Sequence, residues 1–201
     1  QQSFAQRNYD EYNRIGFHAG LSFTDIATSN FTTKQGSGFM GGFTTRGSFR
    51  GAFDLVYGLN FVSAAVGVLA QNSGQDVFVD YTVQGAQIML LGSLNIVKHH
   101  LSLEFGPALN ISGKLKLNSE SQEAYLLDGY NELQAGDIND INTINFHVAG
   151  GVTAGIESFR VYGHYQYGVT NMLGSLNDDG LEVDNFDGHM STLTVGAVFY
   201  F

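Results

Sequence analysis

The chain of 201 residues has no cysteine, no tryptophan and a single proline. The lack of cysteine excludes a disulfide scaffold, a thiolate metal site and a cysteine nucleophile. No run approaches the roughly 20 consecutive apolar residues that a membrane-spanning helix needs. Glycine and aromatic residues are abundant instead, with 26 glycines, 16 phenylalanines and 10 tyrosines. This composition suits one domain built from many uninterrupted strands.

The net charge is −10, and most of the acidic residues fall in two segments, 120–140 and 178–187. A basic surface is missing, so nucleic acid is not a predicted partner. Mean hydropathy is −0.03, a value that suits a soluble sandwich and also a transmembrane barrel, whose strands each turn one face to a polar interior. The start at Gln1 and Gln2 predicts a mature N-terminus from which a signal peptide has been removed.

Alternation of apolar and polar residues with a period of two predicts eight strands. They cover 14–26, 36–46, 51–61, 86–97, 100–111, 143–156, 159–171 and 190–201. In the first strand Ile15, Phe17 and Leu21 alternate with Gly16, His18 and Ser22. No apolar face carries a charge, and the charges within the strand cores all lie on the opposite faces. A soluble sandwich or a lipocalin-like barrel shares this alternation and is the alternative reading.

Turn lengths and the last strand favour a membrane barrel. Predicted short turns (47–50, 98–100, 157–159) alternate with predicted long loops (25–35, 71–76, 118–142, 171–189), as in outer-membrane barrels. The final strand places Thr194, Gly196, Phe199 and Phe201 in the slots of the barrel-assembly signal at the C-terminus. We therefore predict an all-β protein, an eight-stranded antiparallel up-and-down transmembrane β-barrel over 14–201. Its polar lumen is filled, and residues 1–13 form a periplasmic arm.

The chain resembles the small outer-membrane β-barrel domain of the Bacteroidota, which includes PorT-like proteins and OmpX-like eight-stranded barrels. The resemblance lies in IGFHAGLS at 15–22, GAQIMLL at 85–91, EFGPAL at 104–109, HYQYGVTN at 164–171 and the terminal strand. Met89 departs from it, because a proline is expected after the Gln87-Ile88 pair. The resemblance implies a barrel in the bacterial outer membrane with both termini in the periplasm, and it brings no catalytic residues.

The inward faces of the predicted strands carry ionisable groups. His18, Asp54, Glu104 and His164 lie at about one level, and His147 also points inward. Just below that level lie Arg14, Arg46 and Arg160. Because buried charges are costly unless paired, we interpret these residues as a polar network that plugs the lumen. The alternative is a metal site or a proton-linked gate, since histidine and carboxylate are metal ligands.

The acidic loops are interpreted as solvated surface, or as surface bridged to lipopolysaccharide by divalent cations. The alternative is a weak calcium site at Asp178, Asp179, Glu182 and Asp184, because oxygen-rich loops suit Ca²⁺. The spacing is not that of an EF-hand. No other cofactor is predicted.

Two surfaces are candidates for a protein partner. Residues 62–80 either project beyond the membrane as a hairpin whose edge could pair with another chain, or form a tall barrel rim. A lipid-facing area of small residues is formed by Ala19, Gly150, Ala154, Gly163 and Ala197. We interpret it as ordinary lipid contact; the alternative is a partner face, because small residues allow close approach within membranes.

Three functions compete at this point. The preferred one is a non-enzymatic accessory or scaffold subunit of an outer-membrane complex for secretion or barrel assembly. The alternative is a stand-alone surface receptor or adhesin that acts through the acidic loops. An enzyme needs a nucleophile, a base and an acid in one place, and only His189 with Ser191 near the membrane boundary comes close. Predicted partners are outer-membrane lipid, lipopolysaccharide, the barrel-assembly machinery and a further outer-membrane protein.

Overall fold

The computed structural model describes residues 12–98 and 100–201. Most of the predicted N-terminal arm lies outside the described residues. Within them, no helix is both long enough and apolar enough to span a membrane.

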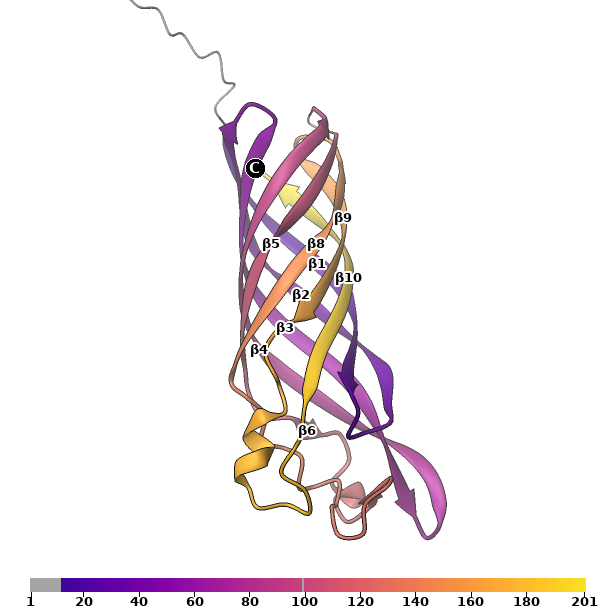
Figure 1. The fold of residues 1–201 in the computed structure, drawn as a ribbon. Helices are drawn as coiled ribbons and strands as arrows, with labels where there is room; N and C mark the ends of the chain where they lie inside the picture. Colours follow the sequence, from indigo (N-terminus) through magenta and orange to yellow (C-terminus); the bar gives the residue numbers. More distant parts are fainter. Residues whose placement is uncertain (1–11, 99) are drawn as a thin grey trace, which may run out of the picture.

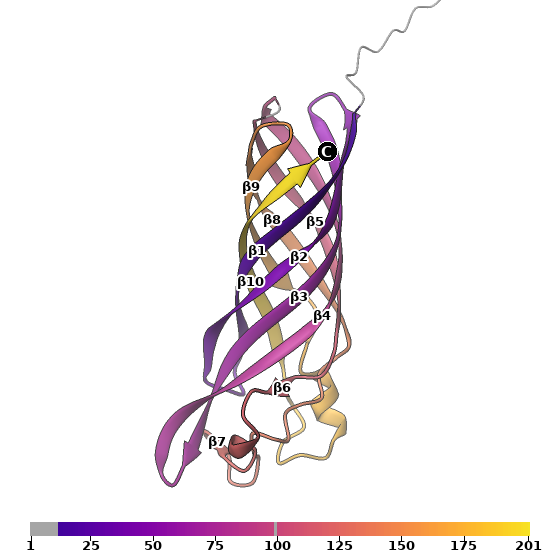
Figure 2. The ribbon, with the colours of Figure 1, turned by 180° about the vertical axis from the view of Figure 1, so that it is seen from behind.

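Eight long antiparallel strands close into a ring (Figures 1 and 2). They are β1 (Asn13–Thr28), β2 (Thr33–Arg50), β3 (Phe53–Asn72), β4 (Gln75–Val97), β5 (Leu101–Ser112), β8 (Ile144–Gly155), β9 (Phe159–Gly168) and β10 (Gly188–Tyr200). Each long strand pairs with the next long strand in sequence, and β10 pairs with β1 from Tyr200–Gly16 to Gly188–Thr28. The predicted fold class, an eight-stranded up-and-down barrel, is confirmed.

The barrel has two distinct ends. Tyr12 and Phe201 lie at one, the terminal end, where the backbone N–H of Phe201 donates to the carbonyl of Ile15. The opposite, loop end holds a long loop 3 at 113–143 and a long loop 4 at 169–187 (Figure 1). Loop 3 includes the short strands β6 (Lys116–Leu117) and β7 (Leu126–Leu127) and the 3₁₀ turn η1 (Glu120–Gln122), and loop 4 includes the 3₁₀ turn η2 (Gly174–Asp178).

The outward face of the barrel wall is apolar, as the alternation predicts. Phe17, Leu21 and Leu59 are 51%, 64% and 58% exposed. The inward neighbours Ser22 and Asn60 are buried. Such a wall belongs in lipid, where closed strand pairing satisfies every backbone hydrogen bond.

Two of the four predicted long loops are instead mostly strand. The connection between β1 and β2 is only 29–32, and β3 turns into β4 at Ser73 and Gly74, both with positive φ. The β2–β3 turn also lies further along than predicted, after Arg50. In β2 the pairing register shifts between Gln35 and Phe39, so one extra residue breaks the alternation there. The regular pattern therefore did not reveal the strand on the loop side of this bulge.

The loop end is closed by an apolar core that we call the cap core. It joins inward residues of the strands with residues of the loops. Its members are Ile26, Phe31, Ala64, Val66, Val68, Ala70, Val79, Tyr81, Val83, Leu115, Leu127, Leu133, Ala135, Ile138, Ile141, Met172, Leu173, Leu176, Phe186 and Met190. The cap, meaning these residues with loops 3 and 4 and the β3–β4 hairpin beyond Phe61, is thus a folded body and not a set of separate loops.

Loop 3 also covers the edges of the projecting β3–β4 hairpin. β7 pairs with Ala70 and Gln71 of β3, and β6 pairs with Tyr81 and Thr82 of β4. The hairpin projects, but at these positions its edges are occupied by the chain itself. They are not open to another chain there, because their backbone groups are already paired.

Candidate functional site

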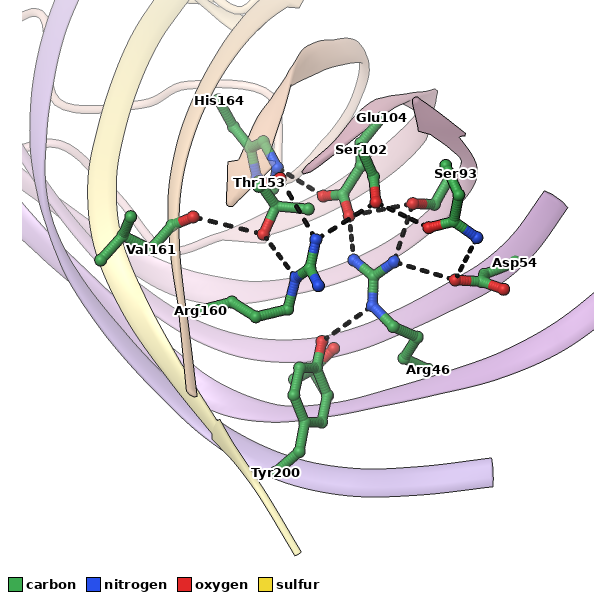
Figure 3. A network of polar contacts seen from close by, with 12 residues as sticks. Arg46, Asp54, Ser93, Ser102, Glu104, Thr153, Arg160, Val161, His164 and Tyr200 are labelled. Carbon is green, nitrogen blue, oxygen red and sulfur yellow. Dashed lines mark hydrogen bonds and ion pairs between the residues drawn. The ribbon is translucent and has the colours of Figure 1, made fainter. Parts of the chain in front are cut away.

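A network of ionic and polar side chains fills the lumen near the terminal end (Figure 3). Arg46 of β2 is its centre and makes ion pairs with Asp54 of β3, at 3.2 Å, and with Glu104 of β5. The second Glu104 oxygen lies 2.7 Å from Nε2 of His164 on β9. All four residues are buried. Three predicted lumen residues, Asp54, Glu104 and His164, are therefore linked in one network, and Arg46 pairs with both carboxylates.

Neutral groups complete this network. The Tyr12 hydroxyl and the Asn95 amide donate to the Asp54 carboxylate at 2.6 and 3.1 Å. Arg160 lies beside it and donates to Ser102 and Thr153. Tyr12 and Asn95 could not be assigned to the network from the alternation, because their contacts depend on barrel stagger.

Arg14 lies at the edge of the lumen network. Its guanidinium pairs with Glu157 at 2.7 Å on the rim of the terminal end and lies 5.0 Å from the centre of the Tyr12 ring. The predicted lumen role of Arg14 is therefore confined to the rim, since the residue is only the second of β1 and its long side chain reaches the turn between β8 and β9.

A second, uncharged network lies nearer the middle of the barrel. His18 bonds to Asn60 through Nε2 (2.7 Å) and to Tyr162 through Nδ1 (2.9 Å). The Asn60 amide donates to Gln87, and the Gln87 amide donates to Asn110 and to Gln166. Because the Asn60 oxygen is an acceptor, Nε2 of His18 donates to it. His18 is therefore part of this uncharged network and not of the ionic one.

Glycine makes room for the ring of Tyr162. A Cβ atom on Gly196 would lie 2.6 Å from the Tyr162 hydroxyl, and one on Gly20 would lie 2.9 Å from it. Gly196 and Thr194 of the C-terminal signal thus face inward, while Phe199 and Phe201 are exposed on the outside. The signal residues therefore serve both the lumen packing and the lipid face.

A cavity of about 30 Å³ remains between the two networks, with His18, Arg46, Glu104 and His164 among its lining residues. This volume is large enough for one or two waters. His147 lies elsewhere in the wall, and its buried Nδ1 has no hydrogen-bond partner in the structure. His147 therefore does not join the lumen network to which it was assigned. Within 12–98 and 100–201, no cluster of three or more His, Cys, Asp or Glu residues could hold a metal ion.

The four acidic residues of the predicted calcium site are not gathered around a common point. The Glu182 carboxylate accepts hydrogen bonds from the backbone N–H groups of Asn131, Glu132 and Leu133 in loop 3. N–H donors at this carboxylate occupy the lone pairs that a cation would need. The backbone N–H of Glu132, followed by that of Asn131, holds the pKa of Glu182 below its usual value. Asp178, Asp179 and Asp184 are exposed.

Charge is distributed unevenly along the barrel. Most of the 19 acidic residues lie at the loop end. They are Asp25, Asp76, Asp80, Glu120, Glu123, Asp128, Glu132, Asp137, Asp140, Asp178, Asp179, Glu182, Asp184 and Asp187. The basic residues at this end are Lys34, Lys114 and Lys116, and Lys114 pairs with Asp140. The cap therefore carries a strongly negative field.

His189 and Ser191 do not form a hydrolytic site. Nδ1 of His189 bonds to the carbonyl of Gly168 at 2.9 Å, and Nε2 lies 3.6 Å from Asp187. Both ring nitrogens thus face other groups, and neither is placed to accept a proton from Ser191.

The small residues of the predicted partner face are only partly contiguous. Ala19 and Ala197 pair directly across β1 and β10, and Ala19 also faces Gly41 of β2. Gly163 has open space beside it, whereas the ring of Phe105 lies 3.6 Å from the Cβ position of Gly150. Ala154 is separated from Ala197 by Val161. The shallow area is therefore centred on Ala19 and Ala197.

The closed ring, the apolar outer wall and the polar filled lumen define a β-barrel membrane protein. A family model, "Outer membrane protein beta-barrel domain", matches residues 4–174. The chain therefore belongs to this family, and it is a protein of the bacterial outer membrane. No curated protein sequence matches the chain.

Solved structures of small outer-membrane barrels share the fold. Neisserial surface protein A (NspA) has a TM-score of 0.56 at 12% identity, over 93% of this chain and 97% of that chain. Ail, the attachment invasion locus protein of Yersinia pestis, has a TM-score of 0.51 at 13% identity, over 94% and 99%. Ail is also similar in its complex with the heparin analogue sucrose octasulfate, with a TM-score of 0.50 at 13% identity, over 94% and 99%. At these identities the likeness is one of fold.

Proposed function

We propose that the protein is a non-enzymatic surface receptor or adhesin whose working part is the cap. The observation that carries this proposal is that the β1–β2 turn, loop 3 and loop 4 fold around one apolar core and present an acidic surface. Phe31 of the β1–β2 turn stacks on Phe186 of loop 4 at 5.6 Å and packs against Tyr130 of loop 3 at 5.9 Å. A pre-ordered surface binds with a smaller loss of conformational entropy than free loops do.

The lumen gives the proposal indirect support. The ionic network, the uncharged network and the cap core follow one another along the axis, and this filling does not suit transport of a solute through the lumen. In this proposal the loop end faces the outside of the cell and both termini face the periplasm. The acidic loops meet lipopolysaccharide at their base, where divalent cations offset the like charges.

The charge of the cap indicates a cationic partner, such as a basic protein surface. Ail has been solved with a sulfated polyanion; an acidic cap favours ligands of the opposite sign. The test is binding of the purified protein in lipid nanodiscs to a lysine-rich peptide and to sucrose octasulfate at several salt concentrations. The proposal expects salt-sensitive binding of the peptide, weakened in a variant with Asp178, Asp179 and Asp184 changed to Asn. Equal binding by this variant, or preference for the polyanion, contradicts it.

A second candidate is an accessory subunit of an outer-membrane complex. It is favoured by the paired Ala19 and Ala197 with open space at neighbouring Gly163, which would let a partner approach the wall. The sequence segments that resemble PorT-like barrels of the Bacteroidota agree with this role. Recovery of the tagged protein from native membranes in mild detergent tests it, because a large stoichiometric complex supports the subunit role and a single barrel contradicts it. Leucine at Ala19 and Ala197 should reduce recovery of such a partner.

A further inference from the structure

Three consecutive backbone N–H groups in loop 3 converge on one carboxylate. Glu182 Oε2 accepts from Asn131 at 3.0 Å, Glu132 at 2.8 Å and Leu133 at 3.1 Å. Oε1 accepts from the backbone and the side-chain amide of Asn131, both at 3.1 Å. Successive N–H groups that point into one concavity form a nest, an arrangement that binds anions.

The nest lies at the surface and is joined to the cap core. Asn131, Glu132 and Glu182 are exposed, whereas Leu133 is buried in the core. Leu181 and Val183, on either side of Glu182, pack against the same core. Packing of Leu133 in the core therefore fixes the position of the nest. Packing of Leu181 and Val183 likewise fixes the segment that carries Glu182.

We propose that Asn131, Glu132 and Leu133 form a carboxylate-binding site whose resident ligand is the Glu182 side chain. In this arrangement loop 4 acts as a tethered ligand for loop 3. Removing the Glu182 carboxylate would leave three N–H donors available to a free carboxylate. This site joins loop 4 to loop 3 within the cap, so the proposal does not depend on which partner the cap binds.

The tether explains why the nest holds Glu182 and not a free anion. Glu132, whose N–H is part of the nest, carries a negative side chain of its own. A carboxylate on an anchored neighbouring segment is present at high effective concentration, so a free carboxylate enters the nest only when the tethered one has been removed.

The experiment uses the full chain, labelled with ¹⁵N in lipid nanodiscs, and titrates acetate against chloride at constant ionic strength. In Glu182→Ala, acetate should shift the amide resonances of residues 131–133 saturably. In the unchanged protein and in Asp179→Ala, which removes an exposed carboxylate of the same loop, the nest stays occupied and acetate should have little effect. Hydrogen bonds to a charged group are strong enough that Glu182→Ala should also speed proteolysis of loop 4 about tenfold, with partial protection by acetate.

Two results would overturn the proposal. One is the absence of a saturable acetate effect in Glu182→Ala. The other is an equal effect in all three proteins, which would show unspecific binding. If alanine unfolds loop 3, Glu182→Leu keeps much of the side-chain volume without supplying an acceptor, and failure of acetate to shift the nest resonances in that variant also counts against the site.

Discussion

The two ends of the barrel interior contain opposite kinds of side chain, polar and charged at the terminal end and apolar at the loop end. Toward the terminal end, Arg46, Glu104 and His164 face inward and phenylalanines face outward. Toward the loop end β3 and β4 turn Val66 and Val83 inward to the cap core. The first half has the inverted arrangement of a membrane barrel, and the second half has the ordinary arrangement of a water-soluble domain.

This difference shows where the solvent changes along a continuous strand. β3 presents the apolar residues from Phe53 to Phe61 outward. The same face then continues with Ser63, Ala65, Gly67, Leu69 and Gln71, where Leu69 is the only large apolar residue. Neither the pairing with β4 nor the direction of the strand is interrupted between them. A change in side chains alone therefore converts a lipid-facing wall into the wall of a folded cap.

The largest loss of unfolding free energy should come from disrupting the ionic network at the terminal end. Arg46→Ala leaves Asp54 and Glu104 buried without their shared cation, which should cost about 3–5 kcal/mol of unfolding free energy. Urea unfolding in lipid vesicles measures this. Arg14→Ala removes a rim pair that includes the exposed Glu157 and is the control, with an expected cost below about 1 kcal/mol. Equal costs for the two changes would contradict the assignment of Arg46 as the centre of the network.

A cavity in the apolar half should destabilise the cap alone. Leu176 is fully buried in the cap core, and Leu176→Ala should cost about 2–5 kcal/mol. Amide exchange should rise in loops 3 and 4 while the strands near the terminal end keep their protection. Leu126→Ala, at a partly exposed site, should change little. Uniform loss of protection over all strands would show that the two halves are one cooperative unit.

A matched pair of lysine substitutions on one strand face sharpens the comparison. Leu59 and Leu69 both lie on the outward face of β3, ten residues apart. Leu59→Lys should cost about 2–4 kcal/mol near the middle of the lipid layer, and close to the interface or beyond it the cost falls to about 0–1 kcal/mol. Leu69→Lys should show the smaller value. Unfolding of both variants in vesicles measures the difference, and similar costs would place both residues in the same solvent.

The smallest effect should be an acid-dependent loosening of the cap. The backbone N–H of Glu132 and its neighbours lowers the pKa of Glu182, so its contribution is present above the ordinary glutamate value. That contribution is lost as the pH falls through the lower, folded-state value. Protease protection of loop 4 should therefore decline in acid below about pH 4, in line with the ordinary carboxyl pKa. Glu182→Gln should lack this step, and its persistence in that variant would assign it to another carboxyl group.

The alternation in the sequence was enough to predict the barrel wall and the inward positions of Asp54, Glu104 and His164. It was not enough for the cap core, because Leu133, Ile138, Leu176 and Phe186 are separated by polar residues without a period. Only tertiary packing brings them together.

Individual side-chain contacts could not be predicted from the sequence either. Arg14 turns to Glu157 at the rim, and Glu182 binds backbone N–H groups of loop 3 in place of a cation. Both outcomes depend on which segments the barrel and loops place side by side. The extra residue in β2 hid the strand before it, so a tight turn was predicted as a long loop.

The most direct test of a single barrel in two solvents is an accessibility scan along the outward face of β3. The chain has no cysteine, so single cysteines at positions 55, 57, 59, 61, 65, 69 and 71 can each carry a nitroxide label. Labels at 55–61 should be relaxed by lipid-soluble oxygen, and labels at 65–71 by a water-soluble nickel complex. Oxygen-dominated relaxation along the whole strand, or nickel-dominated relaxation along all of it, would contradict the account.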